Sequence, residues 1–253
     1  MHAKVVWALS GAVLASSAFV ALLFPSAFGP ALPWRAAPIA GRTEPAVAAA
    51  SASVHHRHAN FGDAPASPDA RQFADWVAHT GDNAGSDFVI VDKKLARLYV
   101  FDADAGLRAT TAVLLGAAVG DDSVPGIGKR PIAQVQAQER TTPAGRFMGE
   151  PGHNALGHDV VWVDYDAAVS IHRVINTLVS EHRLQRLASA TVDDKRISYG
   201  CINVPVAFYE TYIRTTFAER RAPIYVLPEV KSVRQVFGAY PVSMANTQVR
   251  VNG

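Results

Sequence analysis

The residue best able to carry out chemistry in this chain is Cys201, the only cysteine among 253 residues. It lies in the segment ISYGCINVP, residues 197–205. A thiol is a strong nucleophile once deprotonated, but at its ordinary pKa of about 8.5 only a few per cent is thiolate at neutral pH. Cys201 therefore needs a base or a positive charge beside it before it can act in catalysis.

The best candidate for that base is His172, in the segment VSIHR at residues 169–173. The segment alternates like a β-strand, which holds a side chain rigidly and fixes its direction. Gly200 allows a sharp backbone turn next to the nucleophile, so that amides there can point toward a developing oxyanion. Together these residues predict acyl transfer through a covalent intermediate.

The alternative is that Cys201 is a small buried hydrophobe, the commonest role of a lone cysteine. Two features favour the nucleophile. The N-terminal residues predict export, and an unpaired thiol in an oxidising compartment is a liability unless it is used. The residues around Cys201 also form a specific pattern.

The pattern SYGCIN at residues 198–203, with an Ile-His pair upstream, resembles the active-site signature of the L,D-transpeptidase (YkuD-type) catalytic domain. The resemblance implies that Cys201 is the acyl-accepting nucleophile and His172 its base. The chain departs from the family pattern in two places. Tyr199 stands where the family usually has a second histidine, and the segment 173–197 is longer than usual, with a helix expected over 177–187.

The resemblance covers residues 86–228 and includes the segments VIVDK at 89–93 and TPAG at 142–145. It implies a mainly β, sandwich-like fold with a few helices. The implied reaction attacks an L-to-D peptide bond in a peptidoglycan stem peptide, forms a Cys201 thioester and passes the acyl group to an amine. The partners would be peptidoglycan stem peptides, and no cofactor is expected.

Supporting roles are assigned to neighbours of the two catalytic candidates. Gly200, Tyr199 and Ser198 are the candidates for stabilising the oxyanion and its loop, and Ser198 can also make ordinary turn hydrogen bonds. Asn203 and Arg173 are the candidates for binding substrate. For Asn203 with Tyr199, an orienting role and simple packing are equally open.

A metal centre is the weaker interpretation of the histidines in this region. His153 and His158 could bind metal together with His172, but their spacing fits no usual ligand motif, and no carboxylate or cysteine completes a set. We therefore expect no metal, and we interpret His153 and His158 as loop residues near a substrate groove.

The first 24 residues predict a signal peptide or a signal anchor. Lys4 precedes an uncharged run from Val5 to Phe24, which is about long enough to span a bilayer. A retained membrane anchor is favoured slightly over a cleaved signal, and both predict a periplasmic or cell-envelope location. Residues 25–68 form a Pro/Ala-rich linker, residues 69–228 the catalytic domain and residues 229–253 a C-terminal tail.

Composition agrees with a globular enzyme. The formal net charge is only +2, which does not favour nucleic acid as a partner, and one cysteine excludes an internal disulfide framework. Local patterns predict further elements: a helix capped by Ser67 and ended by Gly81, a helix from Pro205, a short helix at 232–237, and strands at 87–92, 97–102, 160–165, 168–172 and 224–227.

Three other functions remain open at this stage. With water as acceptor, the same site would be an L,D-carboxypeptidase. If Tyr199 and the longer 173–197 segment have removed the chemistry, the chain would be a catalytically weak peptidoglycan-binding protein. A metal-dependent peptidase using His153, His158 and His172 is the least favoured.

Overall fold

The computed structural model describes residues 57–218 and 220–242. The predicted export segment and most of the predicted linker lie outside the described residues. Within the described residues, none of the helices is both long enough and apolar enough to cross a membrane.

A mixed sheet of eight strands forms the body of the domain, in the order β3-β2-β1-β10-β5-β6-β7-β9. The expectation of a mainly β fold with few helices is confirmed. The strands are β1 (Phe88–Asp92), β2 (Arg97–Phe101), β3 (Leu107–Ala112), β5 (Gly145–His153), β6 (Asp159–Asp164), β7 (Val169–Arg173), β9 (Ile202–Val204) and β10 (Ala222–Val226). A separate parallel pair joins β4 (Leu115–Gly116) to β8 (Arg196–Ser198).

Strand β5 divides the sheet into two halves, in place of the two separate sheets of a sandwich. Residues Gly145–Gly149 pair with β10, and residues Glu150–His153 pair with β6. Gly149 stands where β5 changes its pairing partner, and an added Cβ there would clash with the ring of Phe217. Both halves contribute to one core, because Val89 and Ile171 belong to the same buried cluster.

Strands β1, β2 and β10 are apolar on both faces because each face is covered. Val89 and Val91 of β1 face the core shared with β7 and β9, whereas Phe88 and Ile90 pack beneath helix α1 (Pro68–Thr80). A strand that is buried on both faces is expected to be apolar at every position and not only at alternate ones. The strands expected at 87–92 and 97–102 form β1 and β2, which pair antiparallel, and the parallel pairing of β1 with β10 closes the domain.

Helix α1 begins and ends as its sequence predicts. The Ser67 hydroxyl accepts a hydrogen bond from the Ala70 amide at 3.1 Å, and Gly81 ends the helix in the left-handed conformation with φ of 69°. Phe73 and Val77 are fully buried against the sheet. Phe61 belongs to the same core, so the packed domain begins before the predicted boundary at residue 69.

The remaining helices are short. After β9 the chain forms α3 (Val206–Phe208), the π-helix η6 (Tyr209–Ile213) and α4 (Arg214–Phe217). The 3-10 helices η1 (Ile127–Lys129), η2 (Ile132–Gln134) and η3 (Ala137–Glu139) lie in the loop before β5. The short helix expected at 232–237 is α5 (Val233–Phe237), which Ser232 caps. Val233, Ala239 and Val242 are buried, so the first part of the predicted tail packs on the domain.

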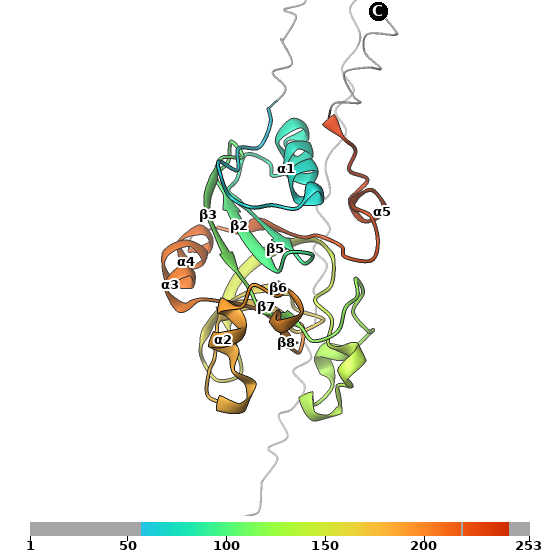
Figure 1. Ribbon diagram of the computed structural model, residues 1–253, viewed down its shortest axis with the longest axis vertical. Coiled ribbons are helices and arrows are strands. Elements are labelled where there is room, and N and C mark those ends of the chain that lie inside the picture. The colour runs from blue at the N-terminus through green and yellow to red at the C-terminus, as the bar shows by residue number, and fades with distance from the viewer. Residues whose placement is uncertain (1–56, 219, 243–253) are drawn as a thin grey trace, which may run out of the picture. The chain divides into compact units, whose positions relative to one another are not determined.

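The segment 173–197 forms compact helical turns instead of one helix over 177–187. It contains η4 (Val179–Glu181), α2 (Arg183–Ala188) and η5 (Asp193–Lys195). His182, with a left-handed φ of 50°, separates η4 from α2 and breaks the expected helix. Figure 1 places α2 near β7 and β8, at the end of the domain opposite α1.

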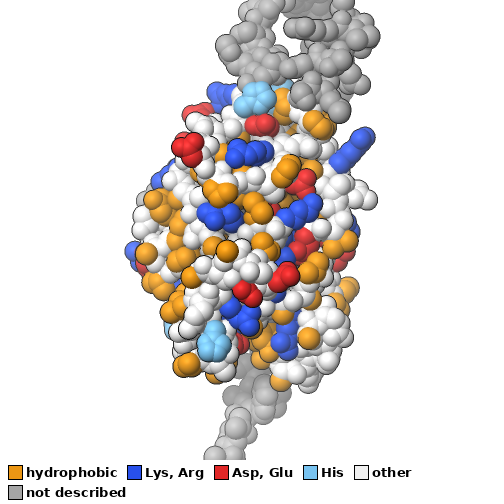
Figure 2. All heavy atoms as spheres, viewed as in Figure 1, with side chains coloured by type: hydrophobic (Ala, Val, Ile, Leu, Met, Phe, Trp, Pro, Cys, Tyr) orange, Lys and Arg blue, Asp and Glu red, His pale blue; other side chains and the backbone are white. Residues whose placement is uncertain are grey.

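Positive and negative side chains are interspersed on the face drawn in Figure 2, without a large patch of one sign. This surface fits the formal net charge of only +2.

Candidate active site

Cys201 and His172 are brought together by two neighbouring parallel strands. In the β7–β9 pairing, Ile171 lies opposite Ile202 and His172 lies opposite Asn203. Cys201 immediately precedes β9, and its half-buried sulfur lies 3.8 Å from Ser170 Oγ and 3.5 Å from the carbonyl oxygen of Ala168. The predicted nucleophile and base therefore share one edge of the sheet.

The surroundings of the sulfur favour its thiolate form. Burial alone would raise the pKa of the Cys201 thiol, but hydrogen bonding and charge from His172, with the backbone amide and hydroxyl of Ser170, outweigh it and lower the pKa below its ordinary value. This is the electrostatic condition that a nucleophilic cysteine requires.

The tautomer of His172 follows from a backbone contact. Its Nδ1 lies 2.7 Å from the carbonyl oxygen of Arg173, which can only accept a hydrogen bond, so Nδ1 carries the proton. In the neutral ring, Nε2 is then the free base. Asn203 Nδ2 lies 3.4 Å from that nitrogen.

The loop of residues 198–201 is held by hydrogen bonds that use its own polar groups. Ser198 Oγ donates to the carbonyl of Cys201 at 2.6 Å and accepts from the Gly200 amide at 3.1 Å, the turn contacts expected for this serine. The Gly200 amide, predicted to face an oxyanion, is thus used inside the loop. The amide of Cys201 makes none of these contacts and is the adjacent backbone donor.

Gly200 is required by both its conformation and its surroundings. Its φ is +124°, and an added Cβ would lie 2.7 Å from the carbonyl oxygen of Thr141. The hydroxyl of the fully buried Thr142 donates to the Gly200 carbonyl at 2.8 Å and accepts from the Gly116 amide at 2.9 Å. The segment at residues 142–145 therefore supports the nucleophile loop.

The ring of Tyr199 packs against a cation. The guanidinium carbon of Arg140 lies 4.0 Å from the centre of the Tyr199 ring. This contact fixes the loop against the segment that follows η3. Tyr199 thus supports the loop from outside, and its role toward an oxyanion stays a prediction.

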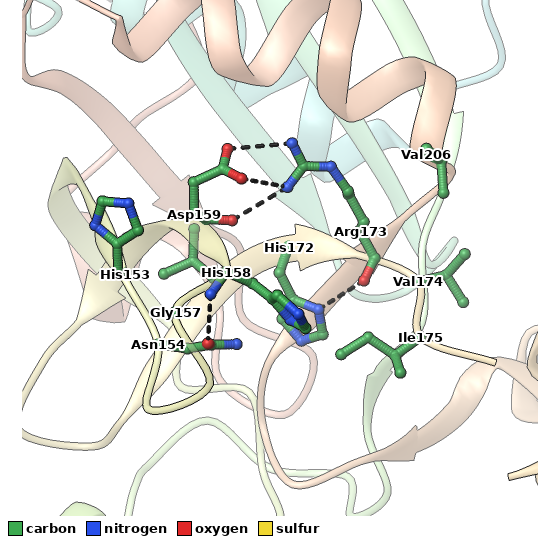
Figure 3. A pocket seen from close by; sticks show the side chains of 11 residues that line it. His153, Asn154, Gly157, His158, Asp159, His172, Arg173, Val174, Ile175 and Val206 are labelled. Carbon is green, nitrogen blue, oxygen red and sulfur yellow. Dashed lines mark hydrogen bonds and ion pairs between the residues drawn. The ribbon is translucent and has the colours of Figure 1, made fainter. Parts of the chain in front are cut away.

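The two residues predicted to bind substrate are engaged within the protein. Arg173 forms a bidentate pair with Asp159, at 2.8 and 3.1 Å, and donates to Glu210 at 2.5 Å (Figure 3). Its guanidinium carbon also lies 4.1 Å from the ring centre of Tyr209. Asn203 is fully buried, and a substrate contact by either residue stays a prediction.

A cavity of about 530 Å³ opens beside His172, between the β5–β6 loop and the chain that follows β7 (Figure 3). Its lining includes His153, His158, Asp159 and Ile175, whereas Cys201 is not part of it. His172 is common to the cavity and to the sulfur site, which agrees with the expectation that the loop histidines lie near a groove. Across residues 57–218 and 220–242, no cluster of three His, Cys, Asp or Glu side chains is arranged to hold a metal ion.

Ser170 and Arg183 are site residues that the sequence analysis missed. Ser170 lies two positions before His172 on one strand, so strand periodicity alone places both on the same face. Arg183 comes from the longer segment, and its Nη1 donates to Asn203 Oδ1 at 2.6 Å. No local pattern could have revealed that contact.

Comparisons with solved structures name the family that the Cys201 motif resembles. The L,D-transpeptidase of Mycobacterium smegmatis is 15% identical, with a TM-score of 0.33 over 56% of this chain and 58% of that one. An L,D-transpeptidase mutant of Enterococcus faecium is 16% identical, with a TM-score of 0.30 over 56% of this chain and 50% of that one. The helical cell shape determining protein Pgp2 of Campylobacter jejuni is 16% identical, with a TM-score of 0.39 over 62% and 55%.

This chain thus spans little more than half the length of the structures it matches. No protein-family model matches the sequence, and no curated relative matches it. At 15–16% identity, the assignment of chemistry depends on the residues of the site itself.

Proposed function

We propose that this protein is a peptidoglycan L,D-transpeptidase that transfers an acyl group through a thioester on Cys201. The observation that carries the proposal is the pairing of strands β7 and β9. This pairing brings a low-pKa thiol beside a histidine whose Nδ1 proton is fixed by the Arg173 carbonyl. The resemblance of residues 198–203 to the family signature supplies the substrate class.

In the first half of the reaction, His172 Nε2 takes the thiol proton, and the Cys201 sulfur attacks the carbonyl carbon of the L-to-D peptide bond. A carbon–sulfur bond forms, and the negative charge moves to the carbonyl oxygen, near the Cys201 amide. When the tetrahedral species collapses, the carbon–nitrogen bond breaks. The terminal D-residue leaves as an amine that takes the proton from His172.

In the second half, an amine of a neighbouring stem peptide attacks the thioester carbonyl. His172 removes its proton, the new amide bond forms, and the Cys201 thiol is regenerated. An oxyanion donor such as the Cys201 amide contributes about 3 kcal/mol in comparable acyl-transfer sites. Peptidoglycan lies outside the cytoplasm, so the proposal includes an exported catalytic domain.

The test is to incubate the full chain with a disaccharide-tetrapeptide and to separate the products by chromatography with mass detection. Cys201→Ala is the control. Cross-linked dimer with released D-residue in the wild type, absent from the control, supports transpeptidation. Tripeptide without dimer would assign a hydrolase, and unchanged tetrapeptide would contradict the enzymatic proposal.

A further inference from the structure

The side chain of Asn203 has its orientation fixed by chemistry on both sides. Its Oδ1 accepts from Arg183 Nη1 at 2.6 Å, and its Nδ2 donates to the Cys201 carbonyl at 3.2 Å. Arginine can only donate and a carbonyl can only accept, so the amide cannot be reversed without losing both contacts. The Nδ2 group therefore faces His172 Nε2, 3.4 Å away.

Arg183 is held in place to make this contact. It is the first residue of α2, and its Nε donates to Glu181 Oε2 at 2.6 Å. Its side chain is only 13% exposed. The other described arginine of α2, Arg186, makes different contacts, with the backbone carbonyls of Glu181 and Asp194. The contact of Arg183 with Asn203 thus links the segment 173–197 to the centre of the site.

We propose that Arg183 is a positioning residue that acts through the Asn203 amide to fix the His172 ring toward Cys201. The inference deepens the proposed function, because it rests on the same nucleophile and base. Without Arg183, the buried Asn203 Oδ1 loses its donor. A buried acceptor without a partner is costly, so the amide turns or admits water. The imidazole then loses the group that faces its Nε2 edge.

Other charged groups near Cys201 and His172 are engaged with other partners or line the adjacent cavity. Arg173 is paired with Asp159 and Glu210. His158 lines the same cavity as His172. Glu181 pairs with Arg183 through Nε, whereas Asn203 accepts from Nη1. Loss of the Arg183 contact is therefore expected to reach the thiol mainly through the orientation of His172.

The test measures the rate of Cys201 alkylation by iodoacetamide as a function of pH in the full chain. It compares wild type with Arg183→Met, Arg183→Lys and the matched control Arg186→Met. For Arg183→Met we expect the midpoint of the pH–rate profile to rise by about one pH unit. The alkylation rate at pH 7 should fall about tenfold, because a loosened imidazole stabilises the thiolate less. Arg183→Lys should restore part of the shift, and Arg186→Met should follow the wild type.

An Arg183→Met profile that superimposes on the wild type would overturn the inference, and so would an equal shift in Arg186→Met. In an Asn203→Ala background, Arg183→Met should cause no further shift, whereas a full additional shift would show that Arg183 acts independently of Asn203. Thermal unfolding of each variant checks that it folds. If Arg183→Met does not fold, Arg183→Lys tests the inference in its place.

Alkylation needs no peptidoglycan substrate. A shifted profile without transpeptidation would therefore retain this inference while rejecting the proposed function.

Discussion

Two hydrogen-bonded networks meet at the loop that carries Cys201, and they are built differently. Around the sulfur the contacts are long, with 3.8 Å to Ser170 Oγ and 3.4 Å between His172 Nε2 and Asn203 Nδ2. Around the fully buried Lys93 they are short and charged, with 2.8 Å to Asp121 and 2.8 Å to the Thr142 carbonyl. Glu229, which also pairs with Arg196, lies 3.4 Å from the same ammonium.

Thr142 connects the two networks, since its carbonyl accepts from Lys93 and its hydroxyl donates to the Gly200 carbonyl. The charged network leaves its groups little freedom and anchors the chain beneath the loop. At the sulfur, the proposed reaction passes a proton between the thiol and Nε2 of a ring that the Arg173 carbonyl orients. Rigidity beneath the loop thus comes from buried charges, whereas at the sulfur it comes from hydrogen bonds to the His172 ring and the Asn203 amide.

The largest effect is expected from removing the base. His172→Gln should lower the rate of acyl transfer by about 10²–10⁴-fold, because no group would then accept the thiol proton. The thermal midpoint should change little, because the ring is only partly buried. Steady-state kinetics and a thermal melt check this. A large loss of stability would mean that His172 belongs structurally to the anchoring network.

The next effect is on stability. Lys93→Met leaves Asp121 buried without its cation, while Glu229 keeps only Arg196, and this is expected to cost about 3–5 kcal/mol. Lys94→Met is the matched control, because Lys94 is exposed and pairs with Asp69, an interaction worth only about 0–1 kcal/mol. Urea unfolding of both variants checks the difference. If Lys93→Met and Lys94→Met lost the same free energy of unfolding, the network around Lys93 would not anchor the loop as described.

A smaller effect is expected where the two networks meet. Gly200→Ala should destabilise the fold by about 1–3 kcal/mol through backbone strain and contact with the Thr141 carbonyl, and it should also reduce the alkylation rate of Cys201. Gly157→Ala has a comparable positive φ of 79° but nothing within 4 Å of the added Cβ, so its cost is about 1 kcal/mol and the thiol should be unaffected. If Cys201 in Gly200→Ala were alkylated at the wild-type rate, the loop conformation at Gly200 would not matter for the thiol.

The smallest effect concerns pH. Burial would raise the pKa of Asp121, but amides of Lys231 and Glu229 together with Lys93 lower it to about 2. Since the folded pKa lies below the ordinary value of about 3.9, the carboxylate stabilises the fold fully above about pH 4, and about 2 kcal/mol is lost as the pH falls toward 2. Urea midpoints at about pH 5 and pH 3 should differ less in Asp121→Asn than in the wild type. If the urea midpoint changed by the same amount between these pH values in Asp121→Asn and in the wild type, the lowered pKa of Asp121 would be contradicted.

The sequence predicted what is local and left out what tertiary pairing decides. Ser67 and Gly81 define α1 through contacts within a few residues, so the bounds of that helix could be read from the sequence. The parallel pairing of β1 with β10 joins segments more than a hundred residues apart, which local periodicity does not encode. His182 breaks the helix expected over 177–187 by adopting a positive φ that its sequence does not signal.

The same division holds for the site. Cys201 and His172 were found from residue type and motif, whereas the partners of Arg173 were not, because Asp159 and Glu210 come from different elements. The Gly200 amide was expected to be free, and the Ser198 hydroxyl two residues away occupies it. Arg183 belongs to a segment without a family pattern, so only the folded chain reveals its contact with Asn203.

The most direct test of the central claim is the intact mass of the full chain, quenched in acid shortly after mixing with disaccharide-tetrapeptide. We expect an adduct on Cys201 whose mass equals that of the substrate minus its terminal D-residue, with its position shown by peptide mapping. The adduct should be absent from Cys201→Ala and should be removed by hydroxylamine, as a thioester is. Product formation by the wild type without any adduct on Cys201, or unimpaired product formation by Cys201→Ala, would contradict it.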